Sequence, residues 1–284
     1  MTTQPDPDRA VSFDEIGIAT ARHGRLVLRS AFQLVFRPHG EELRAVAAES
    51  FLRPFRDGMP LPPRPFLASL DQAERLDVEQ VALALHAANH VHIGVDGLSH
   101  MIGLGPAFAV SEGAADILAN CLAAMSVGRD AAAPPLVCGF RATETFDAAA
   151  LTAAARDFRA LGVRLSLAGP PGEQPPLELI ANIAPDIVRI DGAWFRRVAA
   201  SQSALRLLTS LVAALKAQAF QVLAEGIETR GQLAAALDIG ADLVQGFLLS
   251  HPLLAGMVVE STTIARGDFL PDRSQVIPLF GTGR

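Results

Sequence analysis

The sequence predicts an α/β protein of the TIM-like (β/α)8 barrel type, folded as a single domain. Short β-like runs alternate with Ala- and Leu-rich stretches from about residue 30 to residue 255, and this alternation is typical of βα units around a parallel sheet. The chain has 284 residues, of which 50% are hydrophobic, so it can bury one large core. In such a barrel, functional groups gather at the C-terminal ends of the strands.

The predicted strands are short runs of apolar and β-branched residues that end near turn-forming residues. Their number matches the eight strands of the barrel. We assign them to Phe32–Phe36, Ala45–Phe51, Val91–Val95, Leu136–Phe140, Arg164–Leu167, Ile187–Ile190, Gln221–Ala224 and Leu243–Gly246.

The stretches between these strands are rich in residues with high helix propensity. We place helices at Pro65–Asn89, Glu112–Ala124, Asp147–Leu161, Leu177–Ala181, Ser203–Ala217 and Thr229–Leu237. Two segments, Gly58–Pro65 and Gly169–Pro176, are rich in Pro and Gly and are therefore predicted loops.

The rhythm of strands and helices divides the chain into three parts. Residues 1–22 form a predicted N-terminal extension, residues 23–260 the barrel, and residues 261–284 a C-terminal tail. The first nine residues are polar and lack the apolar segment of a signal peptide. No apolar run reaches the roughly 18 residues that a membrane helix needs. We therefore expect a cytoplasmic protein without membrane insertion.

Charge and cysteine content narrow the function further. The net charge is −6 with a pI near 5.6, and acidic and basic residues are interspersed. This distribution lacks the basic stripe of a nucleic-acid-binding protein, so we expect no nucleic-acid partner. The two cysteines, Cys121 and Cys138, lack the spacing of a structural zinc site.

Four segments carry the most specific functional signal. They are Ala48-Glu49-Ser50-Phe51-Leu52-Arg53, Val188-Arg189-Ile190-Asp191, Val222-Leu223-Ala224-Glu225-Gly226-Ile227-Glu228-Thr229, and Gln245-Gly246-Phe247 with Pro252. In this order they resemble the E-A-L-L-R, K-I-D, V-A-E-G-V-E-T and Q-G-Y…P motifs of the EAL domain family of cyclic-di-GMP phosphodiesterases. The resemblance covers roughly residues 25–255.

The resemblance implies a phosphodiesterase that uses two Mg²⁺ or Mn²⁺ ions. Such ions need hard oxygen ligands gathered from several strand ends. Glu49 and Glu225 match two of the family's ligands, and Asp96 falls where the family has an Asn.

Other positions depart from the family's pattern. Arg141 stands where the family has a ligating Glu, or Cys138 does in an ungapped alignment, and Ala168 and Gly169 replace the family's adjacent Asp pair. Arg189 replaces a lysine that acts on the attacking water, and a guanidinium stays protonated and cannot serve as a base. We count Arg141, Ala168, Gly169 and Arg189 as lost catalytic positions. The sequence thus predicts a degenerate EAL domain that is not an enzyme and has no catalytic residue, metal or cofactor.

Three interpretations of function remain open. The first is a regulator in cyclic-di-GMP signalling that contacts another signalling protein, with a homodimer as one arrangement. The second is a metal-independent cyclic-di-GMP receptor, and an active phosphodiesterase is the least favoured. Arg141 either binds a phosphate or pairs internally with Glu49 or Glu225. The ligand-binding residues expected of a receptor are Glu49, Arg53, Arg141, Arg189, Glu225 and Gln245.

Overall fold

A ring of eight strands organises the computed structural model, which describes residues 11–126, 135–142 and 147–269. The strands of the ring are β3 (Leu26–His39), β4 (Glu42–Arg56), β6 (Ser99–Gly103), β7 (Leu136–Arg141), β8 (Arg164–Ala168), β9 (Ile187–Ile190), β10 (Gln221–Ala224) and β11 (Leu243–Val244). They pair in the order β3-β11-β10-β9-β8-β7-β6-β4, and β3 pairs with β4 to close the ring. The predicted (β/α)8 barrel is confirmed.

One strand of the ring runs against the others. From β4 round to β11 every pairing is parallel, whereas β3 is antiparallel to both β4 and β11. The reason is local: β3 and β4 are joined by the two-residue turn Gly40-Glu41, which allows only a hairpin. In Gly40 the backbone has a φ of 56°, a conformation that glycine adopts without strain.

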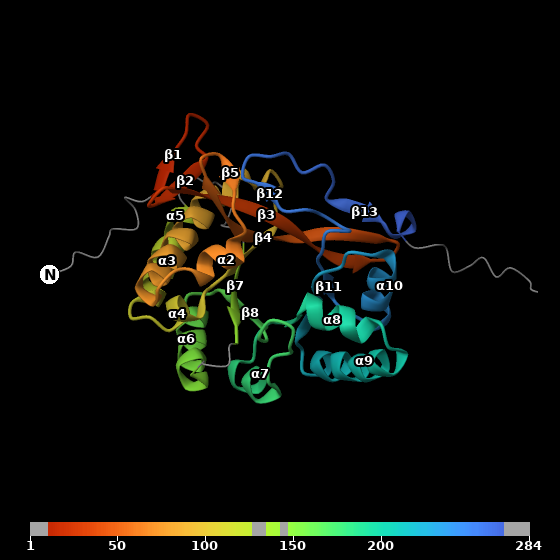
Figure 1. Cartoon of the computed structure of the whole chain (residues 1–284). Coiled ribbons are helices and arrows are strands. Elements are labelled where there is room, and N and C mark those ends of the chain that lie inside the picture. The colour runs from red at the N-terminus through yellow and green to blue at the C-terminus, as the bar shows by residue number, and fades with distance from the viewer. Residues whose placement is uncertain (1–10, 127–134, 143–146, 270–284) are drawn as a thin grey trace, which may run out of the picture.

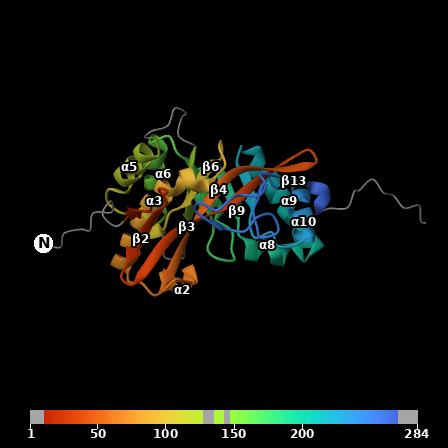
Figure 2. The same cartoon turned by 90° about the horizontal axis from the view of Figure 1, so that it is seen from above.

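The helices lie around the outside of the ring (Figures 1 and 2). Their buried faces and the outer faces of the strands form one large apolar cluster, which contains Phe108, Phe140, Phe158 and Phe195. The helices are α2 (Pro63–Ala68), α3 (Gln72–Asn89), α4 (Pro106–Ala109), α5 (Ala114–Ser126), α6 (Ala148–Ala160), α7 (Leu177–Ile183), α8 (Gly192–Ala199), α9 (Gln202–Ala217) and α10 (Arg230–Asp238), with short 3-10 turns η1 (His90–Ile93) and η2 (Arg266–Asp268).

A separate apolar layer fills the inside of the barrel. Its buried members come from seven different strands and are Val35, Ala47, Met101, Val137, Ile187, Leu223 and Leu243. Side chains two residues apart on a strand face the same side. The next inward positions toward the C-terminal ends of β4 and β9 are Glu49 and Arg189, both buried. The apolar layer therefore forms the floor under a polar site.

Short strands extend the ring at both ends of the described chain. β1 (Val11–Phe13) pairs with β2 (Ala19–His23), β2 pairs with β3, and β13 (Thr263–Ala265) pairs with β4. β5 (Met59–Pro60) extends the β4 edge, and β12 (Leu253–Leu254) pairs with β3. Residues of the expected N-terminal extension and C-terminal tail thus take part in the sheet, and the boundaries at residues 22 and 260 stay predictions.

The predicted strand Val91–Val95 is wrong. The helix α3 runs to Asn89 and continues into the 3-10 turn η1, which ends at Gly94 with a φ of 77°. The ring strand is instead β6, at Ser99–Gly103. A capping box at Asp71 and Glu74 fixes where α3 begins, and the alternation in Val91–Val95 mimicked a strand.

Two further differences concern helices. The predicted helix Pro65–Asn89 is two helices, α2 and α3, separated where Asp71 caps α3. The helix α8 was not predicted. Asp191 begins it by accepting hydrogen bonds from the backbone N–H groups of Ala193 and Trp194. Within the described residues, no helix is long and apolar enough to cross a membrane.

Three buried histidines lie between α3 and the barrel. His86 Nδ1 lies 2.8 Å from Ser30 Oγ, His100 Nε2 lies 3.0 Å from Ser50 Oγ, and the rings of His90 and His100 stack with centroids 6.2 Å apart. Burial lowers the pKa of His86 to about 3. Burial lowers the pKa of His100 as well, and repulsion from His86 and His90 adds to this effect. The surroundings of His86 and His100 therefore disfavour the charged form of each ring.

We expect His86 to make the protein sensitive to acid. An unfolded histidine has a pKa near 6.5, so the unfolded state takes up this proton first, and stability falls as the pH drops from about 6.5 toward about 3. Urea denaturation between about pH 7 and pH 4.5 should show that His86→Asn flattens the pH dependence by up to about 1.4 kcal/mol per pH unit. The exposed His39 provides the control, since His39→Asn should keep the wild-type slope. A slope unchanged in His86→Asn would disprove the assignment.

Candidate functional site

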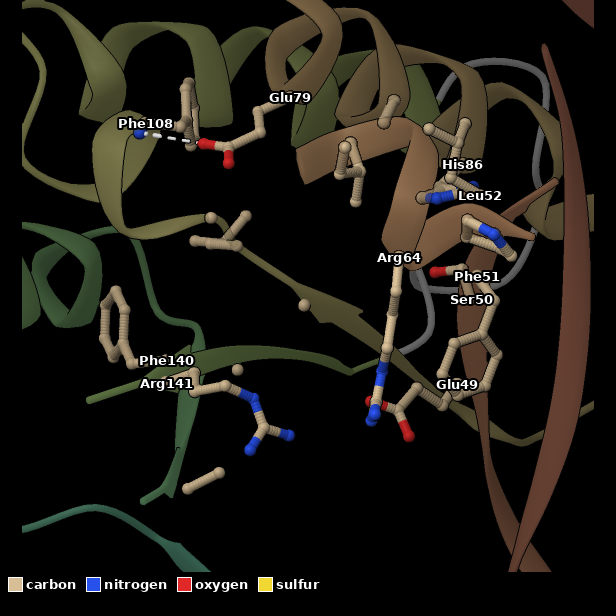
Figure 3. A pocket seen from close by; sticks show the side chains of 18 of the residues that line it. Glu49, Ser50, Phe51, Leu52, Arg64, Glu79, His86, Phe108, Phe140 and Arg141 are labelled. Atoms are coloured by element: carbon tan, nitrogen blue, oxygen red, sulfur yellow. Dashed lines mark hydrogen bonds between the residues drawn. The ribbon is translucent and has the colours of Figure 1, made fainter. Parts of the chain in front are cut away.

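A cavity of about 490 Å³ opens at the C-terminal ends of the strands (Figure 3). Its lining comes from several barrel strands and from the helices α2 and α3 on one side. The structure brings all six residues of the predicted ligand site into this one cavity, which we call the mouth pocket: Glu49, Arg53, Arg141, Arg189, Glu225 and Gln245. Their role in binding a ligand stays a prediction.

Arg189 holds the centre of the mouth pocket. Its Nη2 donates a hydrogen bond to Glu49 Oε1 at 2.7 Å, and its Nε donates to Glu225 Oε1. The side chains of Arg189 and Glu49 are only 8% and 5% exposed, and that of Glu225 is 14% exposed. One guanidinium therefore bridges two carboxylates that come from β4 and from the end of β10.

The charge on Arg189 is secured by this arrangement. Burial alone lowers the pKa of an arginine, but the charges of Glu225 and Glu49 and their hydrogen bonds outweigh it and raise the pKa of Arg189 above its usual value. Charge-assisted hydrogen bonds of this kind are stronger than neutral ones. Arg189 is therefore a permanent cation at the floor of the pocket, held between two carboxylates.

The backbone around the bridge leaves room for it. On β7, a Cβ at Gly139 would lie 3.2 Å from Arg189 Nη1 and 3.1 Å from Ser166 Oγ. After β10, Gly226 has a φ of 67°, and a Cβ there would lie 2.8 Å from the Cα of Gly192. Gly226 lets the chain turn next to the start of α8, which positions the neighbouring Glu225 at the mouth.

Arg141 does not pair with Glu49 or Glu225, so that alternative is wrong. Its Nη1 donates a hydrogen bond to the carbonyl oxygen of Gly169 at 2.9 Å and lies 3.8 Å from Asp191 Oδ2. Arg189 has already taken both carboxylates. Arg141 instead fixes the start of the Pro-rich loop, and its remaining N–H groups face the pocket (Figure 3).

The loop at Gly169–Pro176 follows β8 closely. A Cβ at Gly169 would lie 2.4 Å from the carbonyl carbon of Gln174, so the loop folds back directly onto this glycine. Ala168 lines the pocket but carries no functional group. In this loop the described residues offer the pocket no carboxylate.

Two candidates of the sequence lie elsewhere. Asp96 is exposed in the turn before β6, at the opposite end of the barrel from the mouth, so its assignment as a ligand was wrong. Cys138 is buried in the outer apolar cluster. Burial raises the pKa of its thiol, and the neighbouring Cys121 adds a smaller effect in the same direction. Arg141 is thus the charged residue of β7 that lines the mouth. Thr143 and Glu144, next to it in sequence, lie outside the described residues.

Sequence analysis missed the contribution of the helices α2 and α3. Arg64 of α2 lines the mouth pocket, as do Arg75 and Glu79 of α3. Glu79 is occupied, since it accepts hydrogen bonds from Arg75 Nε at 3.1 Å and from the backbone N–H of Phe108 at 3.1 Å. The segment around Arg64 was taken as a loop because of its prolines, although a proline at the first turn of a helix is a known start signal.

Fold and site together define a class: a (β/α)8 barrel with one antiparallel strand and a charged, arginine-rich pocket at the C-terminal strand ends. The comparison with protein families identifies it more closely. The EAL domain family matches residues 25–252, most of the chain. The protein belongs to the EAL domain family.

Individual relatives agree with this assignment. Cyclic di-GMP phosphodiesterase NbdA of Pseudomonas aeruginosa is 30% identical over 113 residues, which cover 40% of this chain and 14% of NbdA. The calcium and cyclic-diGMP complex of Klebsiella pneumoniae BlrP1 superposes with a TM-score of 0.70 at 21% identity, over 94% of this chain and 61% of that one. BlrP1 with FMN, cyclic diGMP and no metal ions gives a TM-score of 0.65 at 20% identity, over 84% and 57% of the chains. The chain therefore spans only part of these relatives.

The comparisons contradict the prediction that the chain is not an enzyme. NbdA, which matches this chain in sequence, is a cyclic di-GMP phosphodiesterase. The match to the EAL domain family spans the barrel. The error came from treating substitutions at Arg141, Ala168, Gly169 and Arg189 as sufficient to decide activity. Sequence positions show which groups are present, whereas activity depends on what the assembled protein does.

The described residues do not fit a pair of divalent metal ions in the arrangement observed. Glu49 and Glu225 each give one oxygen to Arg189, whose charge would repel a cation placed between them. In the described part of the chain, no group of three or more His, Cys, Asp or Glu side chains is close enough to hold a metal ion. We derive no catalytic step through a metal.

We expect Arg189 to be essential for stability. Replacing it with Met leaves two buried carboxylates without a countercharge, so the free energy of unfolding in urea should fall by about 3–5 kcal/mol. Adding Glu49→Gln and Glu225→Gln to Arg189→Met should recover much of this loss. Arg196→Met is the matched control: its pair with Glu228 is half exposed and should contribute no more than about 1 kcal/mol. Similar small losses in both single variants would refute the central role of Arg189.

Proposed function

We propose that this EAL domain binds cyclic-di-GMP in the mouth pocket, with arginine side chains receiving its phosphates, as a ligand-binding domain in cyclic-di-GMP signalling. The observation that carries the proposal is the charge left after internal pairing. Arg189 forms ion pairs with Glu49 and Glu225, and Arg75 forms an ion pair with Glu79. Three lining arginines then remain for a ligand: Arg53, Arg64 and Arg141.

Arginine is well suited to this task. A guanidinium presents several N–H donors in one plane and can bind a phosphate through two of them. Arg53 and Arg64 have no hydrogen-bond or ion-pair partner among the described residues, and Arg141 contacts a carboxylate only at 3.8 Å. Cyclic-di-GMP carries two negatively charged phosphodiester groups, which match this surplus of positive charge.

Buried polar atoms without partners support the same ligand. Within the described residues, Gln245 Nε2 and Glu49 Oε2 are buried and have no hydrogen-bond partner. Both residues line the mouth pocket, and one offers a donor while the other offers an acceptor. Buried polar groups are costly unless they are hydrogen-bonded, so a polar ligand would gain from satisfying them. The cavity of about 490 Å³ is in the size range of small-molecule sites.

The relatives make metal-independent binding a reasonable form of the proposal. One of the BlrP1 complexes contains cyclic diGMP without metal ions, so a neighbour of this fold holds the ligand in that state. In this chain the cation at the floor of the pocket is Arg189, which is part of the protein. We propose that binding does not require an added divalent ion.

A second function, hydrolysis of the same ligand, is favoured by the phosphodiesterase NbdA among the relatives. Binding and hydrolysis would use one pocket, so a single experiment can separate them. Action through another signalling protein and formation of a homodimer stay predictions.

Isothermal titration with cyclic-di-GMP, run in EDTA and again in excess Mg²⁺, tests the proposal when the nucleotide is then analysed for linear product. We expect binding in both buffers with similar affinity. Arg53→Gln should weaken it about tenfold or more, because a charge-assisted hydrogen bond contributes about 1.5–3 kcal/mol.

The other outcomes are equally clear. Linear product that forms only with Mg²⁺ would establish phosphodiesterase activity and a metal-dependent state of the pocket. Absence of heat in both buffers would reject cyclic-di-GMP as the ligand and direct attention to protein partners.

A further inference from the structure

Arg64 differs from Arg53, Arg141 and Arg189 because the helix α2 supplies it, whereas those three arginines lie on barrel strands. The helix α2 comes after the hairpin of β4 and β5, and the backbone N–H of Leu61 donates to the carbonyl oxygen of Pro54 at 2.8 Å, which ties the segment to β4. Phe66 of the same helix is buried against Val78 and Leu85. Pro63 and Pro65 restrict the backbone on either side of Arg64. The base of this side chain is therefore held firmly.

The side chain of Arg64 points into the mouth pocket. In Figure 3 it extends from its helix toward the floor, where Glu49 lies. Arg64 is an exposed residue, so a ligand can reach it. Glu49 and Glu225 each give one oxygen to Arg189, and Arg64 forms no ion pair with either of them in the described part of the chain.

A second cavity, of about 500 Å³, adjoins the mouth pocket at this point. We call it the side pocket. Arg64, Arg141, Glu225 and Gly226 line both cavities, so the two arginines stand at their junction. The acidic residues at the junction and in the side pocket all have partners in the chain. Glu225 pairs with Arg189, and Glu228 pairs with Arg196. Asp191 accepts hydrogen bonds from the first N–H groups of α8 through Oδ1, and its Oδ2 lies 3.8 Å from Arg141.

We propose that Arg64 and Arg141 form a clamp that binds one phosphate at the junction of the mouth pocket and the side pocket. The proposal rests on the proposed function and assigns to it a binding residue, Arg64, that lies outside the four sequence motifs. Arg141 is fixed from below by its hydrogen bond to Gly169, while Arg64 comes from above on α2. A phosphate between them can accept hydrogen bonds from both guanidinium groups.

The experiment measures two ligands on the full chain in buffer with EDTA, cyclic-di-GMP and inorganic pyrophosphate, by isothermal titration. Arg64→Gln should weaken the binding of both about 10- to 100-fold. Arg64→Lys should give an intermediate loss, since lysine keeps the charge but cannot bind through two parallel N–H groups. Arg156→Gln is the matched control, because Arg156 is exposed on α6, away from the pocket, and its replacement removes the same charge. The affinities of this variant for both ligands should stay within about twofold of the wild type.

Each result separates the clamp from the proposed function. Unchanged cyclic-di-GMP affinity in Arg64→Gln would overturn the clamp and leave the proposed function standing. The wild type could instead bind pyrophosphate but not cyclic-di-GMP, with pyrophosphate binding lost in Arg64→Gln. That result would support the clamp and reject cyclic-di-GMP as its ligand. A wild-type protein that binds neither ligand would overturn both.

Discussion

The bridge from Arg189 to Glu49 and Glu225 is the interaction on which the site depends. It joins β9 to β4 and to the end of β10, three places on the ring that are far apart in sequence. Such a bridge forms only after the barrel has closed, and its groups are buried, so breaking one side leaves an unpaired charge. The layer of apolar side chains beneath it shields the bridge from water and keeps it in place.

The bridge also determines what the rest of the pocket can do. The bridge holds one oxygen of each of its two carboxylates, and Arg75 pairs with Glu79. Arg53, Arg64 and Arg141 are then the lining arginines without a close carboxylate partner. The proposed ligand, a phosphodiester, matches the positive charge of these arginines. In this EAL domain the guanidinium of Arg189 lies between two carboxylates of the mouth pocket.

The fold was largely predictable from the sequence because its signals are local. Short apolar runs such as Ile187–Ile190 and Gln221–Ala224 were located to the residue. The failure at Val91–Val95 shows the limit: four or five alternating residues fit a strand equally well, and the capped helix α3 before them decided the outcome. The β3–β4 strands proved longer than their apolar centres because hairpin pairing extends into polar residues.

The sequence by itself determined the barrel, the family resemblance and six of the residues that line the mouth, since motifs at the ends of parallel strands meet at one end of the barrel. Only the tertiary structure decided that Arg189 rather than Arg141 holds the carboxylates, and that Arg64 reaches the pocket from α2. The physical reason is that the formation of an ion pair depends on the distance between the side chains in space and on competition between several arginines for two carboxylates. The spacing of residues along the chain reveals neither the distance nor the outcome of the competition.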